Sequence, residues 1–227
     1  MDKLGLKVEY IYHSCYSVES SNFQLVFDYF KGNIVIKDKD VVVFASHSHP
    51  DHYSEEIFRW SRGKENISYV LSDDINLETT NMIQMVAPYE SHQVNGLMIS
   101  TLSSTDMGVS YLVEMDGINI FFAGDLHWWY WNDDTDEEKK RMEEAFKGEV
   151  LRLKGLRIDL AFFPVDPRLQ ENYHLGGQYF IEELSPKYFF PLHFGDNYKV
   201  TEDFINKINS DTTRIIPIGN KNQVTDI

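Results

Sequence analysis

The sequence predicts an α/β protein of one domain, in which mixed sheets are covered by helices. Short apolar runs rich in β-branched and aromatic residues dominate the first half, and their length is typical of strands. The second half interleaves such runs with segments of helical period. No linker, repeat or low-complexity segment divides the 227 residues, so we expect a single domain over residues 1–227.

The expected strands of the first half are short and closely spaced. Ser20-Ser21-Asn22 resembles a turn and indicates a hairpin, and Asp116-Gly117 indicates a second one. Residues 41–45 are apolar throughout, which is typical of a strand buried on both faces. The strands expected in this half cover residues 7–11, 16–20, 23–27, 41–45, 68–71, 94–102, 109–115 and 118–123.

Helices are expected mainly in the second half. Residues 135–153 have a helical period, and acidic residues gather at their amino end, where the helix dipole favours negative charge. A helix over residues 54–62 would begin at Ser54, a residue type that caps helices. Further helices are expected over residues 177–184 and near 202–208. Strands at 158–164, 187–192 and 214–218 alternate with them.

Charge and composition argue against several classes of protein. The chain carries 21 basic and 36 acidic residues, a formal charge of -15, which opposes nucleic-acid binding because that binding relies on neutralising phosphates. No apolar stretch has the length of a membrane span, and the single cysteine, Cys15, fits a reducing compartment. We therefore expect a cytoplasmic protein with a small-molecule substrate and with no nucleic-acid or membrane partner. Self-association as a homo-oligomer stays open.

The strongest functional signal is a six-residue run directly after the strand expected at residues 41–45. The run is His47-Ser48-His49-Pro50-Asp51-His52. Open α/β sheets place their sites at the carboxyl ends of strands, and Pro50 disfavours a helix through the run. Imidazoles and a carboxylate suit zinc, iron or manganese. Three of the 8 histidines lie here, which favours a metal site over a polar surface loop.

One loop cannot surround a metal, so further ligands should come from other strand ends. Asp125 follows the apolar run at 120–123 and Gly124, a residue that lets the backbone turn sharply beside a site. His193 follows the apolar run at 189–192, and Asp106 precedes the strand expected at 109–115. Taken alone, Asp125 could be a turn residue and His193 a core histidine. Their shared position after apolar strands favours a role as ligands.

These residues resemble the metallo-β-lactamase superfamily of metal-dependent hydrolases. The matching motifs, in the family's order, are His47-x-His49-x-Asp51-His52, Gly124-Asp125 and Pro191-Leu192-His193. The segment Tyr12-His13-Ser14-Cys15-Tyr16 is similar to the start of the branch that contains ascorbate-6-phosphate lactonase. The resemblance implies an αββα sandwich, in which two mixed sheets face one another and helices flank them.

The resemblance also implies a pair of divalent ions, zinc or manganese, with iron as a further candidate. His47 and His49 would bind the first ion, and Asp125 would bridge both. The second ion would be bound by Asp51, His52 and His193.

The family's usual additional histidine for the first ion is missing between the motif and Asp125. We expect Asp106 in its place, a substitution that would favour manganese or iron over zinc. His127 is the alternative, and otherwise the first site is incomplete.

The function implied is hydrolysis by a metal-activated water, which Asp51 and Asp125 would orient. The substrate would be a small, anionic lactone, ester or phosphoester. The acidic chain argues against the nuclease members of the family. Two alternatives stay open: a phosphodiesterase acting on a nucleotide-like ligand, and a non-catalytic metal-binding sensor or scaffold with a degenerate first site.

Several more residues are candidates for substrate binding. Trp128 and Trp129 belong to a run of four aromatics that cannot all share one face, so some of them line a pocket or pack in the core. Arg168 could receive an anionic group or form a surface ion pair. His174 could contact substrate or transfer a proton. His13 could orient a ligand or form a structural hydrogen bond.

Overall fold

The computed structural model describes residues 3–227, which fold into two seven-stranded sheets. The strands of the first sheet are β1 (Lys7–Tyr12), β2 (Cys15–Glu19), β3 (Phe23–Phe27), β4 (Asp40–Ala45), β5 (Ile67–Ser72), β6 (Ile83–Val86) and β14 (Gln223–Asp226). The strands of the second sheet are β7 (Ser91–Val94), β8 (Leu97–Ser103), β9 (Val109–Met115), β10 (Ile118–Phe122), β11 (Leu160–Pro164), β12 (Tyr188–Leu192) and β13 (Arg214–Ile215).

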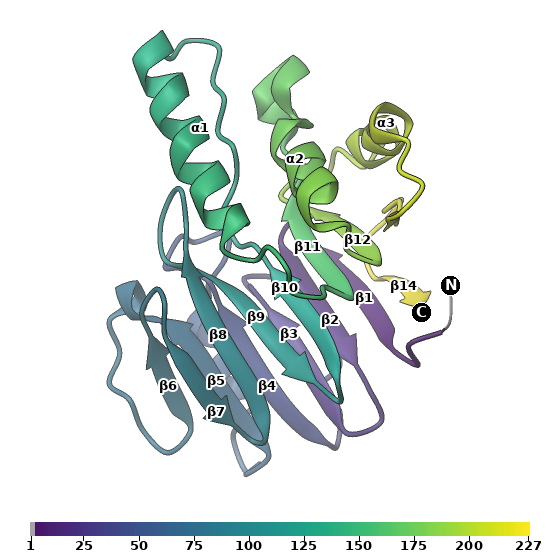
Figure 1. The fold of residues 1–227 in the computed structure, drawn as a ribbon. Coiled ribbons are helices and arrows are strands. Elements are labelled where there is room, and N and C mark those ends of the chain that lie inside the picture. Colours follow the sequence, from purple (N-terminus) through teal and green to yellow (C-terminus); the bar gives the residue numbers. More distant parts are fainter. Residues whose placement is uncertain (1–2) are drawn as a thin grey trace.

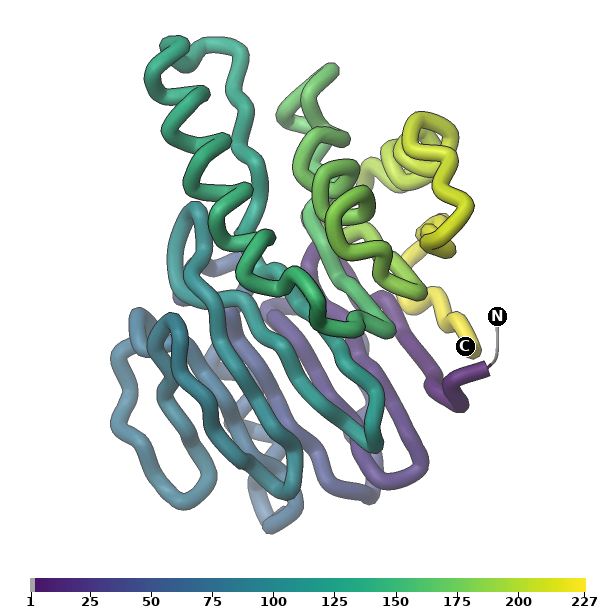
Figure 2. The backbone as a smooth tube through the Cα atoms, viewed as in Figure 1, coloured from purple at the N-terminus to yellow at the C-terminus, as the bar shows by residue number. Residues whose placement is uncertain are grey.

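Both sheets are mixed, as the sequence predicts. The first has the order β14-β1-β2-β3-β4-β5-β6 and the second β13-β12-β11-β10-β9-β8-β7 (Figure 1). Pairs β3–β4, β4–β5, β10–β11 and β11–β12 are parallel, whereas β1–β2 and β9–β10 are antiparallel. The chain builds the first sheet before the second, and its C-terminal segment then returns to pair with β1 (Figure 2).

The helices are α1 (Asp136–Leu151), α2 (Leu175–Leu184) and α3 (Lys199–Ile208), with short 3-10 helices η1 (Glu55–Arg59), η2 (Asp73–Ile75) and η3 (Pro167–Asn172). The α-helices cover one face of the second sheet (Figure 1). Phe121 of β10 stacks on Phe180 of α2, and Phe189 of β12 stacks on Phe204 of α3. Thr135 and Glu138 form a capping box that begins α1.

The main core lies between the two sheets. Because side chains alternate along a strand, the neighbours of the helix-facing residues point the other way. Phe122 of β10 stacks on Phe27 of β3 at 4.7 Å, and Tyr111 of β9 meets Phe44 of β4 edge to face at 5.1 Å. All four rings are fully buried. This packing fixes the position of β4 relative to β10, the two strands that lead into the predicted metal ligands.

The predicted sandwich is confirmed, with one difference in how it is covered. Among residues 3–227, the outer face of the first sheet is covered by η1 and neighbouring loops, where the sequence predicted a helix over 54–62. Between the metal-ligand loop and β5, the chain forms only the short helix η1 and turns. Ser54 caps η1 as expected, accepting a hydrogen bond from the Glu56 amide.

Most of the strand expected at 94–102 is β8, whereas Val94 instead ends the preceding strand β7, and Asn95-Gly96 joins the two. Both turn residues have positive φ, 50° and 86°, as a tight hairpin requires. The edge strands β6 and β14 were not predicted. None of the helices among the described residues combines the length and apolarity that a bilayer crossing needs.

Candidate metal centre

The loop after β4 projects its ligands toward the second sheet. β4 lies between two parallel neighbours, β3 and β5, and ends at Ala45. The carbonyl of His49 accepts hydrogen bonds from the amides of His52 (2.9 Å) and Tyr53 (3.0 Å). This tight turn at Pro50 and Asp51 folds the ligands of the motif onto one side.

A glycine of the second sheet lets its loop approach this turn closely. Gly124, directly after β10, has φ of 55°, and a Cβ there would lie 2.6 Å from the Cβ of Ser46. Only glycine fits such an approach. Asp125 therefore reaches the histidines of the β4 loop, and it is buried there.

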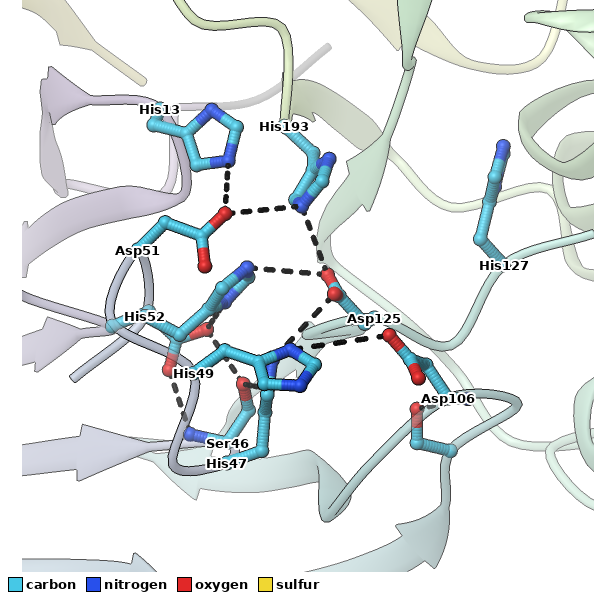
Figure 3. A network of polar contacts seen from close by, with 12 residues as sticks. His13, Ser46, His47, His49, Asp51, His52, Asp106, Asp125, His127 and His193 are labelled. Atoms are coloured by element: carbon cyan, nitrogen blue, oxygen red, sulfur yellow. Dashed lines mark hydrogen bonds and ion pairs between the residues drawn. The ribbon is translucent and has the colours of Figure 1, made fainter. Parts of the chain in front are cut away.

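The first cluster of potential ligands consists of His47, His49 and Asp125, whose ligand atoms all lie within 4.8 Å of one another (Figure 3). His47 Nε2 lies 3.0 Å from His49 Nδ1 and 3.5 Å from Asp125 Oδ2. His47 is fully buried, whereas the His49 side chain is about two-fifths exposed. The structure thus brings together three of the four residues expected around the first ion.

The second cluster consists of His13, Asp51, His52 and His193. His52 Nε2 and His193 Nε2 each lie 3.3 Å from Asp125 Oδ1, and His193 Nε2 lies 4.0 Å from Asp51 Oδ2. The two oxygens of Asp125 therefore face different clusters: Oδ2 faces His47, and Oδ1 faces His52 and His193 (Figure 3). This is the position that a bridging ligand requires.

Asp28, which follows β3, supports both clusters. It is fully buried and accepts hydrogen bonds from the Ser46 amide (2.7 Å), the Ser46 hydroxyl (2.7 Å) and His52 Nδ1 (2.7 Å). The Ser46 hydroxyl gives its only hydrogen to Asp28, so it accepts from His47 Nδ1 at 2.9 Å. Both rings thus carry their hydrogen on Nδ1 and turn a free Nε2 toward Asp125.

His193 is held in the same way. Its Nδ1 lies 3.0 Å from Asp166 Oδ2, and Asp166 is in turn paired with Arg168, whose Nε lies 2.8 Å from the same oxygen. Asp166 is buried, and these partners hold the pKa of its carboxyl well below the usual range despite that burial. Arg168 Nη2, a donor, also lies 3.4 Å from His193 Nδ1, but the shorter contact with the ionised Asp166 keeps the hydrogen on Nδ1, which leaves Nε2 free.

The electrostatics of the site favour a neutral His47 and His52 and an ionised Asp125. Burial lowers the pKa of His52 to about 4 and also lowers the pKa of His47. Burial raises the pKa of Asp125, but nearby His52 and His193 outweigh it and leave that pKa below its usual value. By contrast, Asp125 and Asp166 raise the pKa of His193 despite its burial, and burial raises the pKa of Asp28 to about 7. Neutral imidazole and carboxylate are the forms that bind metals.

The donor set fits divalent metal ions. His52 Nε2 and Asp125 Oδ1 are buried without a hydrogen-bond partner, which is costly unless another group satisfies them. They belong to clusters whose other members are imidazole nitrogens and carboxylate oxygens, the ligands that zinc, manganese and iron accept. An ion in each cluster would satisfy these atoms.

Asp106, the expected replacement for the missing histidine, lies at the edge of the first cluster. Its Oδ2 is 4.0 Å from His49 Nδ1, and its side chain is 44% exposed. The alternative, His127, lies away from both clusters (Figure 3). Its ring is fully buried beside Trp129 and Phe163, so the structure places it in the core.

A cavity of about 440 Å³ opens over the clusters. Trp129 and Arg168 line it, together with Trp131 and Asp106. The two other candidates for substrate contact lie elsewhere. Trp128 packs on Phe146 of α1 at 6.0 Å, and His174 directly precedes α2. Neither contributes to the lining of this cavity.

Sequence reasoning missed Asp28 and gave His13 only as a residue that could orient a ligand or form a structural hydrogen bond. Asp28 carries the same signal as Asp125 and His193, because it directly follows an apolar strand. His13 lies in the family-like opening segment, but nothing there indicates that it reaches Asp51. Asp166, which supports His193, likewise follows a strand, β11.

The sandwich and its two clusters define a metal-binding protein of the metallo-β-lactamase fold. A family model described as the β-lactamase superfamily domain matches residues 7–145, and the chain belongs to this family. A protein of Thermococcus kodakarensis, described as a UPF0173 metal-dependent hydrolase, is 27% identical over 138 residues. That match covers 53% of this chain and 61% of the relative, so it spans less than two thirds of the relative's length.

Solved structures share the fold over nearly the whole chain. Igni18, a metallo hydrolase from Ignicoccus hospitalis, superposes with a TM-score of 0.69 at 14% identity and covers 98% of both chains. The metallo-β-lactamase fold protein YhfI from Bacillus subtilis gives a TM-score of 0.64 at 14% identity, covering 97% of this chain and 98% of its own. At such identities the likeness is one of fold.

Proposed function

We propose that the protein is a metal-dependent hydrolase with a dinuclear site, acting on a small molecule that carries an ester, lactone or phosphoester bond. The observation that carries this proposal is Asp125, whose two oxygens face two separate ligand clusters. Membership of the β-lactamase superfamily and the description of the Thermococcus relative as a metal-dependent hydrolase support it.

When bound, divalent ions supply an activated water near neutral pH and positive charge that polarises the scissile bond. The chain's own residues prepare the site for them. Asp28 and Asp166 hold the imidazoles in the ligating form, and Asp125 is buried at the centre. Asp51 is about half exposed to the cavity, where its carboxylate can orient a water or accept a proton. We propose zinc or manganese as the metal, with iron as a further candidate.

The cavity walls favour a substrate with an anionic group. Arg168 lines the cavity with a side chain that is 60% exposed, although Asp166 balances its charge. A phosphorylated lactone, as in the lactonase branch that the opening segment resembles, has such a group. A second candidate is phosphodiester hydrolysis on a nucleotide-like ligand, because Trp129 and Trp131 lie parallel, 6.0 Å apart, beside the guanidinium.

Metal analysis combined with a turnover screen tests the proposal. The purified protein, loaded with zinc, manganese or iron, should bind two ions per chain and hydrolyse members of an ester, lactone, phosphomonoester or phosphodiester panel. Asp125→Ala should lose most of its metal and all turnover, whereas the exposed control Asp196→Ala should retain both. Two bound ions without turnover would support the sensor or scaffold instead. Undiminished metal content in Asp125→Ala would contradict the bridging role.

We also propose that the protein works in the cytoplasm on its small-molecule substrate, without nucleic-acid or membrane partners. The formal charge of -15 and the free, buried Cys15 support this. Cell fractionation tests the location, and a nucleic-acid binding assay tests whether the protein binds nucleic acid.

A further inference from the structure

His13 lies on the tight turn between β1 and β2 and is tied to the loop that carries His193. Its φ of 57° is unusual for a residue with a side chain. Its amide donates to the Tyr10 hydroxyl at 2.8 Å, and its carbonyl accepts from the His193 amide at 3.1 Å. Its ring lies 4.3 Å from the ring of His193. The turn and the His193 loop therefore hold one another in place.

The hydrogen bonds of the ring identify its tautomer. The amide of Gly195 donates to His13 Nδ1 at 3.1 Å. A backbone amide is always a donor, so Nδ1 is an acceptor and carries no hydrogen. The neutral ring then carries its hydrogen on Nε2. This atom is buried and makes no hydrogen bond of standard geometry, and Asp51 Oδ2 lies 3.4 Å from it as the acceptor that it faces. A ring in this state has no lone pair on Nε2 to offer a metal.

The three buried histidines of the centre have the opposite arrangement. The Nδ1 atoms of His47, His52 and His193 each face an acceptor: the Ser46 hydroxyl, Asp28 and Asp166. Their Nε2 atoms are free toward Asp125. His13 therefore lies within the second cluster, but its ring is the opposite tautomer from those of His52 and His193.

We propose that His13 is a positioning residue rather than a metal ligand: it donates its Nε2 hydrogen to Asp51 and fixes the His193 loop through Gly195. This inference rests on the proposed dinuclear site. The second ion would be held by Asp51, His52, His193 and Asp125. Asp51 is the most exposed of these four ligands and is the one that gains from an outer hydrogen bond, because such bonds orient a ligating carboxylate.

The tautomer can be measured directly by NMR. In protein labelled with ¹⁵N-histidine at pH 8, long-range ¹H–¹⁵N spectra distinguish the two neutral tautomers, and the loss of signals in His13→Gln assigns those of His13. We expect His13 to have the Nε2–H form in both the metal-free and the zinc-loaded protein, with Nδ1–H forms for His47, His52 and His193. An Nδ1–H form of His13 in either state would overturn the proposal.

A matched pair of variants separates the two hydrogen bonds of the ring. In His13→Gln the amide nitrogen can replace Nε2 as a donor to Asp51, and in His13→Asn the amide oxygen can replace Nδ1 as the acceptor for Gly195. Both should bind two zinc ions per chain. The affinity for the second ion should fall about 10–100-fold in His13→Asn and only a few-fold in His13→Gln.

The comparison variant is His193→Gln, which removes a proposed ligand and should leave one ion per chain. One ion per chain in His13→Gln, with an unchanged melting temperature, would make His13 a ligand and overturn the proposal. If the parent protein binds no metal, the proposed function fails. The NMR measurement on the metal-free protein would still test whether His13 Nε2 carries the hydrogen.

Discussion

Asp28→Asn should disable the centre without removing a proposed ligand. Asp28 is fully buried and accepts three hydrogen bonds, two from Ser46 and one from His52. Asparagine has the same shape, but one oxygen becomes an NH2 group. The Ser46 amide keeps the remaining oxygen in the Oδ1 position, so the NH2 group takes the Oδ2 position. In the parent protein Oδ2 lies 2.7 Å from His52 Nδ1, so the NH2 group would face this nitrogen.

Two donors cannot face one another at that distance, so His52 must move its hydrogen to Nε2. That hydrogen then points at Asp125 Oδ1, where a metal should lie. Loss of an outer partner of a ligating histidine costs about 10–100-fold in metal affinity, or about 1.4–2.7 kcal/mol. We expect at least this loss for the second ion, because the ligand is also in the wrong tautomer.

Zinc titration against a chromogenic chelator measures this loss, and far-ultraviolet circular dichroism confirms that the variant is folded. Asp159→Asn is the matched control. Asp159 is also a buried aspartate in a hydrogen-bond network, contacting Asn119 and Arg157, but it lies outside both clusters. It should lose stability and keep both ions. A folded Asp28→Asn protein with parental zinc affinity would refute the tautomer argument.

Three further predictions concern single side chains. Asp106→Ala should weaken binding of the first ion and Asp106→His should shift preference toward zinc; parental titrations for both would make Asp106 a surface residue. Burial lowers the pKa of His127 to about 3. In metal-free protein, keeping this ring neutral therefore contributes about 4–5 kcal/mol to the free energy of unfolding above pH 6.5, and this contribution is lost as the pH falls toward 3. His127→Leu should therefore flatten the acid side of the urea-stability profile, and an unchanged slope would contradict this. Burial also raises the pKa of the Cys15 thiol, so a disulfide reagent should label Cys15 only after unfolding, and rapid native labelling would contradict its burial.

Much of the fold could be predicted from the sequence because its strands are apolar and bounded by turns. β4 and β11 are buried at almost every position, and such runs are recognisable without any knowledge of their partners. β6 and β14 were missed because they lie at sheet edges, where half-exposed residues give no strong pattern. The Asn95-Gly96 turn was overlooked inside a run that alternates in polarity on both sides.

The candidate ligands could be predicted from the sequence because each follows a strand, and parallel strands end at the same edge of a sheet. The outer partners were harder to find, since they depend on tertiary distances. The sequence places Asp28 next to β3, but only the packing of β3 beside β4 brings it to Ser46 and His52. The tautomer of His13 depends on Gly195, a contact between residues far apart in the chain.

Each ligand cluster takes residues from both sheets, and this has a consequence for how the protein holds together. A bound ion would act as a reversible cross-link between the two halves of the chain, joining the β4 loop to Asp125 and His193. The free energy of unfolding would then depend on the free metal concentration, rising by about 1.4 kcal/mol for each tenfold increase above the dissociation constant. In a cell that withholds metal, the protein would be less stable as well as inactive.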